Sequence, residues 1–186
     1  GSSSEEKIKA LPDNVYNIKN NVLLGFKDGI DLSQYQNICD TIQIPASVTS
    51  INTLAFYHNF VSTIPSFIKN LTFAEGSNCS SIGQDAFTKS SLTSVTLPSC
   101  LNEILTYAFQ ECSSLISIDF SAAKNLSIIC SYAFQNCSKL TSIVFPDNLS
   151  SIGEYAFSGC SSLTSVTFPS SLRKIDADVF GYCSNL

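Results

Sequence analysis

Apolar and polar residues recur along the chain at a fixed spacing. The heptapeptide LTSVTFP at 163–169 returns 23 residues earlier as LTSIVFP at 140–146. Each copy continues to an Ala-Phe pair, replaced once by Val-Phe, whose phenylalanines are Phe56, Phe87, Phe109, Phe134, Phe157 and Phe180. An aliphatic residue stands five positions before every one of these phenylalanines. A fixed period in the twenties indicates a solenoid, because each repeat can bury its apolar face only against its neighbours.

The pattern within a repeat predicts its local structure. Leu-x-x-Ile/Val-x-Phe/Leu alternates as a strand with one buried face does. Pro98, Pro146 and Pro169 end that strand, since proline cannot donate to the ladder. The following Leu-x-x-Ile predicts a second short strand or an extended turn, and Ala-Phe-x-x-Cys-Ser predicts one helical or 3₁₀ turn with its phenylalanine in the core. We therefore expect a mainly β repeat solenoid whose first strands form a parallel sheet, about 4.8 Å per coil.

Insertions interrupt the period at three places. Two copies carry two extra residues after the first strand, within 74–77 and 121–124. The copy around Phe56 carries about six extra residues between 60 and 67. We expect all three insertions to lie in loops, because the entropy of loop closure grows slowly with length.

The ends of the chain differ from the repeats. Residues 1–4 are interpreted as an expression scar. Residues 5–37 do not follow the period, and their apolar runs around Asn20 and Asn21 predict a hairpin that caps the solenoid. Residues 38–186 hold about six repeats. The chain stops at Leu186, where the next strand is due, so we expect the natural protein to continue with more repeats or an anchor.

Charge and hydropathy exclude some classes of partner. The chain has 186 residues and a formal net charge of −5. Nucleic-acid and anionic-membrane surfaces require a basic stripe, so neither is expected as a partner. No apolar run approaches the roughly 20 residues that a membrane-spanning helix needs. We therefore expect no direct membrane insertion by this segment.

Four of the eight cysteines share one repeat position, three residues after the phenylalanine: Cys112, Cys137, Cys160 and Cys183. There is no Cys-x-x-Cys and no second histidine beside His58, so no metal site is predicted. Disulfides between neighbouring coils stay possible by separation, but side chains on adjacent coils point the same way. The favoured interpretation is a ladder of buried free thiols with weak hydrogen bonds to loop backbone. We expect His58 in a solvent-facing loop, and predict neither catalytic nor cofactor-binding residues.

The outward positions of the first strands form the main candidate for a partner surface. They are Ser94, Thr96, Ser117, Asp119, Ser142, Val144, Ser165 and Thr167. This set is either a solvated β face or a broad, weakly charged platform for a protein or glycan. A second candidate is a flank formed by Tyr107, Tyr132 and Tyr155, which share the position two residues before the phenylalanine. Tyrosine is enriched at interface anchors, whereas serine is not.

The combined repeat resembles the BspA-like branch of the leucine-rich repeat family, whose pattern runs Leu-x-x-Ile-x-Phe-Pro-x-x-Leu-x-x-Ile-x-x-x-Ala-Phe-x-x-Cys-Ser. The resemblance covers about residues 38–186, and the early copies depart from it with Asn59 and Ser90 at the cysteine position. It implies a right-handed, horseshoe-like solenoid in a secreted or surface-anchored microbial protein. Members of that branch are associated with adhesion to host proteins or other cells.

We therefore expect a non-enzymatic domain, extracellular or at the cell surface, that recognises proteins through many modest contacts along the solenoid. Its partner would be a protein or glycan, with a host extracellular-matrix protein as one candidate. Two alternatives stay open. The domain could be a structural spacer, or an accessory binding module of a larger extracellular protein.

Overall fold

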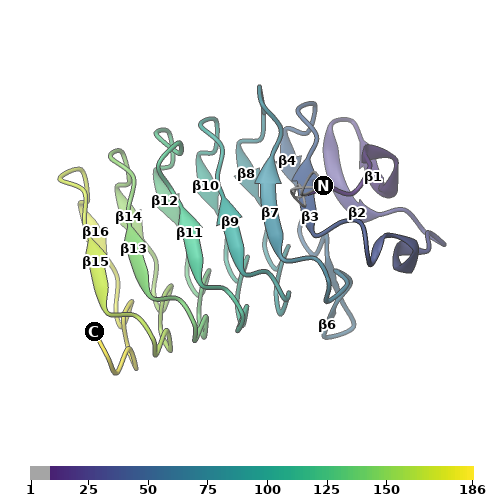
Figure 1. Ribbon diagram of the computed structural model, residues 1–186. Coiled ribbons are helices and arrows are strands. Elements are labelled where there is room, and N and C mark those ends of the chain that lie inside the picture. The colour runs from purple at the N-terminus through teal and green to yellow at the C-terminus, as the bar shows by residue number, and fades with distance from the viewer. Residues whose placement is uncertain (1–8) are drawn as a thin grey trace, which may run out of the picture.

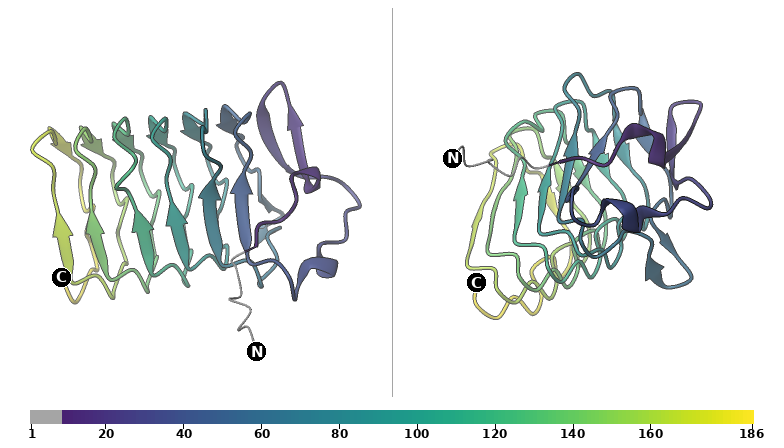
Figure 2. Two further views of the ribbon diagram at one scale, coloured as in Figure 1. Left: turned by 45° about the horizontal axis from the view of Figure 1, so that its top comes forward. Right: turned by 45° about the vertical axis from the view of Figure 1, so that its right-hand side comes forward.

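The computed structural model describes residues 9–186 and arranges the repeats as one row of stacked coils (Figure 1). The scar expected at 1–4 lies outside these residues. Each coil contributes one longer strand and one two-residue strand, and the two kinds lie along separate walls of the stack (Figure 2). This is the mainly β repeat solenoid that the period predicts.

The longer strands follow the alternating segments. They are β3 (Thr41–Ile44), β7 (Asn70–Phe73), β9 (Ser94–Thr96), β11 (Ser117–Asp119), β13 (Ser142–Val144) and β15 (Ser165–Thr167). They pair in parallel in the order β11-β9-β7-β3, and β13 pairs with β15 in a separate two-stranded sheet. The predicted parallel sheet is therefore present but divided between β11 and β13.

The Leu-x-x-Ile segments form the second predicted strand. These strands are β4 (Ser50–Ile51), β8 (Ser81–Ile82), β10 (Glu103–Ile104), β12 (Ile128–Ile129), β14 (Ser151–Ile152) and β16 (Lys174–Ile175). They pair in parallel without a break, and their isoleucines stand in register from coil to coil. This short-strand wall is therefore the continuous element of the stack.

The Ala-Phe segments form hydrogen-bonded turns where one turn of helix or 3₁₀ helix was predicted. Two residues before the phenylalanine the backbone is left-handed in every copy, from Leu54 (φ 59°) to Asp178 (φ 53°). This conformation directs alternate amides along the stack. Phe109 N, for example, donates to Ala133 O at 2.7 Å, and Phe134 N donates to Ala156 O at 2.8 Å. Bonds between coils thus alternate with bonds inside the coil, such as Gln110 N to Tyr107 O at 3.1 Å.

A column of aromatic rings runs through the core. The six repeat phenylalanines stack on one another with ring centroids 5.0–6.0 Å apart. Phe56 to Phe157 are fully buried. Phe168, which the strand alternation places inward, is 47% exposed. The column therefore joins each repeat phenylalanine to the next along the stack.

The N-terminal segment, for which a cap is predicted, packs its apolar residues against the first coil. β1 (Tyr16–Lys19) and β2 (Val22–Phe26) form an antiparallel hairpin, and β2 joins the short-strand wall beside β4. Two 3₁₀ turns, η1 (Asp13–Val15) and η2 (Leu32–Tyr35), complete the segment. Phe26 extends the aromatic column, with its ring 4.8 Å from that of Phe56. Gly25 permits this approach, since a Cβ there would lie 2.3 Å from Ala55 O.

The insertion of the first copy is a hairpin, which corrects the expected loop. β5 (Tyr57–His58) pairs antiparallel with β6 (Val61–Ser62). Asn59 and Phe60 between them have φ of 52° and 65°, as a tight two-residue hairpin turn requires. The hairpin projects from the coil edge near the label β6 in Figure 1. His58 is exposed as predicted, although it belongs to a strand.

Candidate partner-binding surfaces

The eight strand-face residues lie on one face of the longer strands and are in register within each of the two sheets. Ser94 is opposite Ser117 and Thr96 opposite Asp119, and the same pairing joins Ser142 to Ser165 and Val144 to Thr167. All of them except Ser94 are exposed. The structure therefore brings the predicted residues together on one surface, which we call the strand face.

Hydrogen bonds within the chain already occupy two side chains of the strand face. Ser94 Oγ donates to Asn70 Oδ1 at 2.7 Å, which leaves this hydroxyl half-buried. Asp119 Oδ1 accepts from Ser121 N at 2.9 Å. Hydrogen bonds from the side chain and backbone of Ser121 hold the pKa of Asp119 below its ordinary value. Asp119 therefore presents a carboxylate at neutral pH.

A hollow of about 530 Å³ opens on the strand face where the sheet divides. Strand-face residues line it together with others that were not predicted as part of a partner surface: Ile118, Phe120, Ser121, Lys124, Phe145, Pro146 and Asp147. The signal for it was present in the period. Ser121 replaces the proline that ends most first strands, and two extra residues follow it.

The predicted tyrosine flank is a stack of phenol rings. Tyr107 and Tyr132 have ring centroids 5.1 Å apart, and Tyr132 and Tyr155 are 5.2 Å apart. All three are half-buried. At the next copy stands Asp178, whose negative charge and side-chain hydrogen bond raise the pKa of Tyr155. Because the rings face one another, the flank offers ring edges to a partner and little free ring face.

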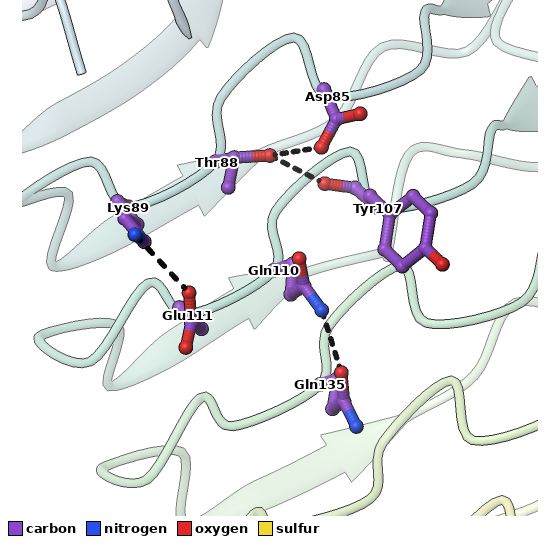
Figure 3. A network of polar contacts seen from close by, with 7 residues as sticks. All are labelled: Asp85, Thr88, Lys89, Tyr107, Gln110, Glu111 and Gln135. Carbon is purple, nitrogen blue, oxygen red and sulfur yellow. Dashed lines mark hydrogen bonds and ion pairs between the residues drawn. The ribbon is translucent and has the colours of Figure 1, made fainter. Parts of the chain in front are cut away.

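Polar contacts between coils continue along the edge beside this flank (Figure 3). The hydroxyl of Thr88 lies 2.9 Å from Asp85 Oδ1 and 2.8 Å from Tyr107 O. Gln110 Nε2 donates to Gln135 Oε1 at 2.6 Å. Lys89 and Glu111 form an exposed ion pair at 3.8 Å, which contributes little in water. These side chains link neighbouring coils and are less available to a ligand.

The four cysteines of the shared position form the predicted thiol ladder. Each Sγ donates to the carbonyl of the phenylalanine one coil back, at 3.2–3.4 Å. Ser90 takes the cysteine position of its coil, and its Oγ lies 3.3 Å from Cys112 Sγ. All eight cysteines are free thiols. The ladder thus has a structural part in the coil-to-coil packing.

Two further classes of site were sought in residues 9–186. No group of three or more His, Cys, Asp or Glu side chains in this range is placed to hold a metal ion. No helix within the same residues has the length and hydropathy to cross a bilayer. Among the described residues, exposed polar and apolar surfaces are the features that could contact a partner.

The repeat also matches a known family. The BspA-type leucine-rich repeat region matches residues 65–186 in six copies, well over half of the chain. The chain belongs to the BspA-type leucine-rich repeat family. The match begins just after the β5–β6 hairpin. This family and its fold are typically non-catalytic.

Solved leucine-rich repeat structures resemble this BspA-type chain. The pneumococcal vaccine antigen PcpA is 26% identical to this chain, with a TM-score of 0.58. The match covers 79% of this chain and 31% of the antigen. A Treponema (T. pallidum) leucine-rich repeat protein has a TM-score of 0.64 at 21% identity, covering 96% and 91%. A leucine-rich repeat protein from Bacteroides capillosus has a TM-score of 0.52 at 22% identity, and the match covers 84% of this chain and 96% of that protein. The last two show the fold, and the chain spans about a third of the pneumococcal protein. No curated protein matches the sequence.

Proposed function

We propose that this domain is a non-catalytic adhesion or protein-recognition module, secreted or at the cell surface, that binds host or neighbouring-cell proteins. The observation that carries the proposal is the strand face, an exposed surface continued over several coils. Membership of the BspA-type family and similarity to a pneumococcal antigen support a surface location. A host extracellular-matrix protein is the first partner to test, with a glycan as the other ligand class.

The repeat itself supports a binding role in preference to catalysis. Phenylalanines and cysteines at the repeated positions are committed to the core or to bonds between coils. The side chains left outward on the strand face are mainly small hydroxyls, held at fixed spacing by the backbone. Such a surface offers many modest contacts with little entropy to lose on binding.

The test is binding of the purified chain to a panel of extracellular-matrix and plasma proteins. It compares wild type with the triple variant Thr96→Lys/Ser142→Lys/Thr167→Lys, which places three bulky cations on exposed strand-face positions. Ser94 is avoided because its hydroxyl bonds to Asn70. A matched control, Asn52→Lys/Gln84→Lys/Asn102→Lys, adds the same charge at exposed positions beside the short-strand wall.

Binding that only the strand-face variant loses would support the proposal and its site. Binding that both variants retain would move the site to the tyrosine flank, where Tyr132→Ala is the next variant. The absence of binding to every member of the panel would contradict the proposal. It would favour a spacer or accessory module, which fits the small share of the pneumococcal protein that this chain spans.

A further inference from the structure

The hollow on the strand face lies between two unpaired sheet edges. β11 ends the four-stranded sheet and β13 begins the two-stranded one. A bond from Thr141 N to Ile116 O (3.4 Å) joins the segments just before the strands, but the strands themselves are not paired. On other coils, Leu97 N donates to Asp119 O and Phe145 N to Thr167 O, both at 3.1 Å. No corresponding bond joins Phe120 N to β13 within the described residues.

The opening follows from the two-residue insertions. β3 and β7 pair over four residues, but β7, whose coil carries an insertion, pairs with β9 over only two. β11 pairs with β9 over three residues, and the insertion after β11 precedes the unpaired side. Pairing thus shortens or fails wherever a coil with the extra residues meets a following coil without them. The hollow is therefore encoded in the repeat length.

The lining combines an apolar floor with a negative rim. Phe120 and Phe145 form the floor at 2% and 4% exposure, and Val144 stands 63% exposed beside them. Asp119 and Asp147 contribute two carboxylates, against one ammonium from Lys124. Both carboxylates and the ammonium belong to exposed residues. The hollow therefore favours a ligand group with an apolar stem and a positive head.

We infer that this hollow receives an arginine side chain from an extended segment of the partner protein; the inference rests on the proposed function. The methylenes of arginine would lie on Val144, and its planar guanidinium would donate to Asp119 and Asp147. The extended backbone of the segment would lie over the strand face, because β11 and β13 have Cα atoms within 8 Å of each other and leave no room for a third strand between them.

A glycan fits this hollow less well. Sugar rings stack on exposed aromatic faces, but both phenylalanines of the hollow are covered by the chain itself. Hydroxyls would also leave the excess of negative charge at the rim uncompensated. An arginine side chain, in contrast, supplies a positive head for the two carboxylates and an apolar stem for Val144.

The test is nuclear magnetic resonance of the isotope-labelled chain with a capped nine-residue peptide, Val-Arg-Val at its centre and Gly and Ser around it. The peptide is expected to shift the amides of β11, β13 and residues 120–124 in a saturable way. The same peptide with citrulline, which keeps the shape but removes the charge, should bind about tenfold more weakly or worse. This comparison needs no variant of the protein.

Two variants then locate the site. Asp119→Asn/Asp147→Asn keeps an acceptor for Ser121 N and should weaken binding about tenfold or more, whereas the control Asp28→Asn/Glu154→Gln, at exposed positions outside the hollow, should not. Val144→Arg should block the hollow with its own side chain. Arginine-independent binding, shifts confined to other surfaces, equal affinity of the double variant, or shifts from an oligosaccharide in place of the peptide would each overturn the inference.

The protein panel separates this inference from the proposed function. A panel protein whose affinity is unchanged by Asp119→Asn/Asp147→Asn would overturn the arginine site and leave protein recognition standing. Saturable peptide binding in the hollow without any panel partner would support the site and contradict the adhesion proposal as tested.

Discussion

At the residue scale, the cysteines of the ladder show how a reactive group becomes a packing group. Cys112, Cys137 and Cys160 are fully buried, and each thiol donates to a carbonyl of the preceding coil. Burial raises the pKa of Cys112 to about 11 and that of Cys160 to about 12. The thiol must stay protonated to keep its bond, so these side chains are poor nucleophiles at neutral pH.

This shift predicts a loss of stability in alkali. The pKa of Cys112 is raised in the folded state, so its contribution is fully present below the ordinary thiol pKa and disappears as pH rises through the folded value, about 11. Between about pH 8 and about pH 10.5 wild type should lose about 2 kcal/mol more unfolding free energy than Cys112→Ala, measured by urea unfolding under reducing conditions. Equal pH dependence of the two proteins would show that Cys112 does not ionise on unfolding.

At the element scale, the two walls of the stack differ in continuity. The short strands pair from β4 to β16 without interruption, whereas the longer strands divide at β11 and β13. The short strands come before the turn that carries the core phenylalanine, where the period is strict. The longer strands come just before the insertions, so unequal coil lengths disturb their pairing and leave the short wall intact.

The division predicts unequal amide exchange in structurally equivalent positions. Leu97 N is bonded to Asp119 O at 3.1 Å, and Phe120 N has no such bond to the next coil. The amide of Phe120 should therefore exchange with solvent about tenfold faster or more than those of Leu97 and Phe145 in native-state exchange by magnetic resonance. Matching protection at Phe120 would mean that β11 and β13 pair in solution.

How far the sequence predicted these elements depends on what determines each of them. Apolar spacing determined the core, so the burial of Phe134 and Ile129 and the exposure of Ser142 and Thr167 followed from the period. The conformation of the turns did not follow from the sequence, because Tyr107, Tyr132 and Tyr155 adopt left-handed φ although they are neither glycine nor asparagine. Bonds to the next coil impose that conformation. Residue type alone therefore carried no signal for the turns.

The candidate surfaces also include one that the sequence predicted and others that it did not. Alternation along a strand was enough to predict the members of the strand face. The hollow depends on how a coil with the extra residues meets one without them, which is a relation between coils. The β5–β6 hairpin likewise depends on Asn59 and Phe60 both being left-handed. Phe60 is 82% exposed at this turn, where only a loop had been expected.

At the scale of the whole molecule, stability comes mainly from contacts between neighbouring coils. Within the aromatic column each ring contacts the rings of neighbouring coils, and the N-terminal hairpin adds Phe26 at one end. Phe157 and Phe180 also contact Phe145 and Phe168, respectively, of their own coils. In such a stack, stability is close to a sum of coil terms and nearest-neighbour terms. A defect in the middle therefore weakens two interfaces, and a defect at an end weakens one.

Phe134 and Phe180 provide the test of this nearest-neighbour behaviour. Phe134 is fully buried between Phe109 at 5.1 Å and Phe157 at 5.0 Å, so Phe134→Ala should cost about 3–5 kcal/mol of unfolding free energy. Phe180 is half-buried and has a column neighbour only in Phe157, at 6.0 Å, so Phe180→Ala should cost about half as much or less. Urea unfolding followed by circular dichroism measures both. Loss of contact on two sides should also separate the unfolding of the flanking coils, which would appear as a smaller denaturant dependence in Phe134→Ala alone. Equal costs, or a Phe134→Ala protein that unfolds like wild type, would contradict a column in which each ring is held by its two neighbours.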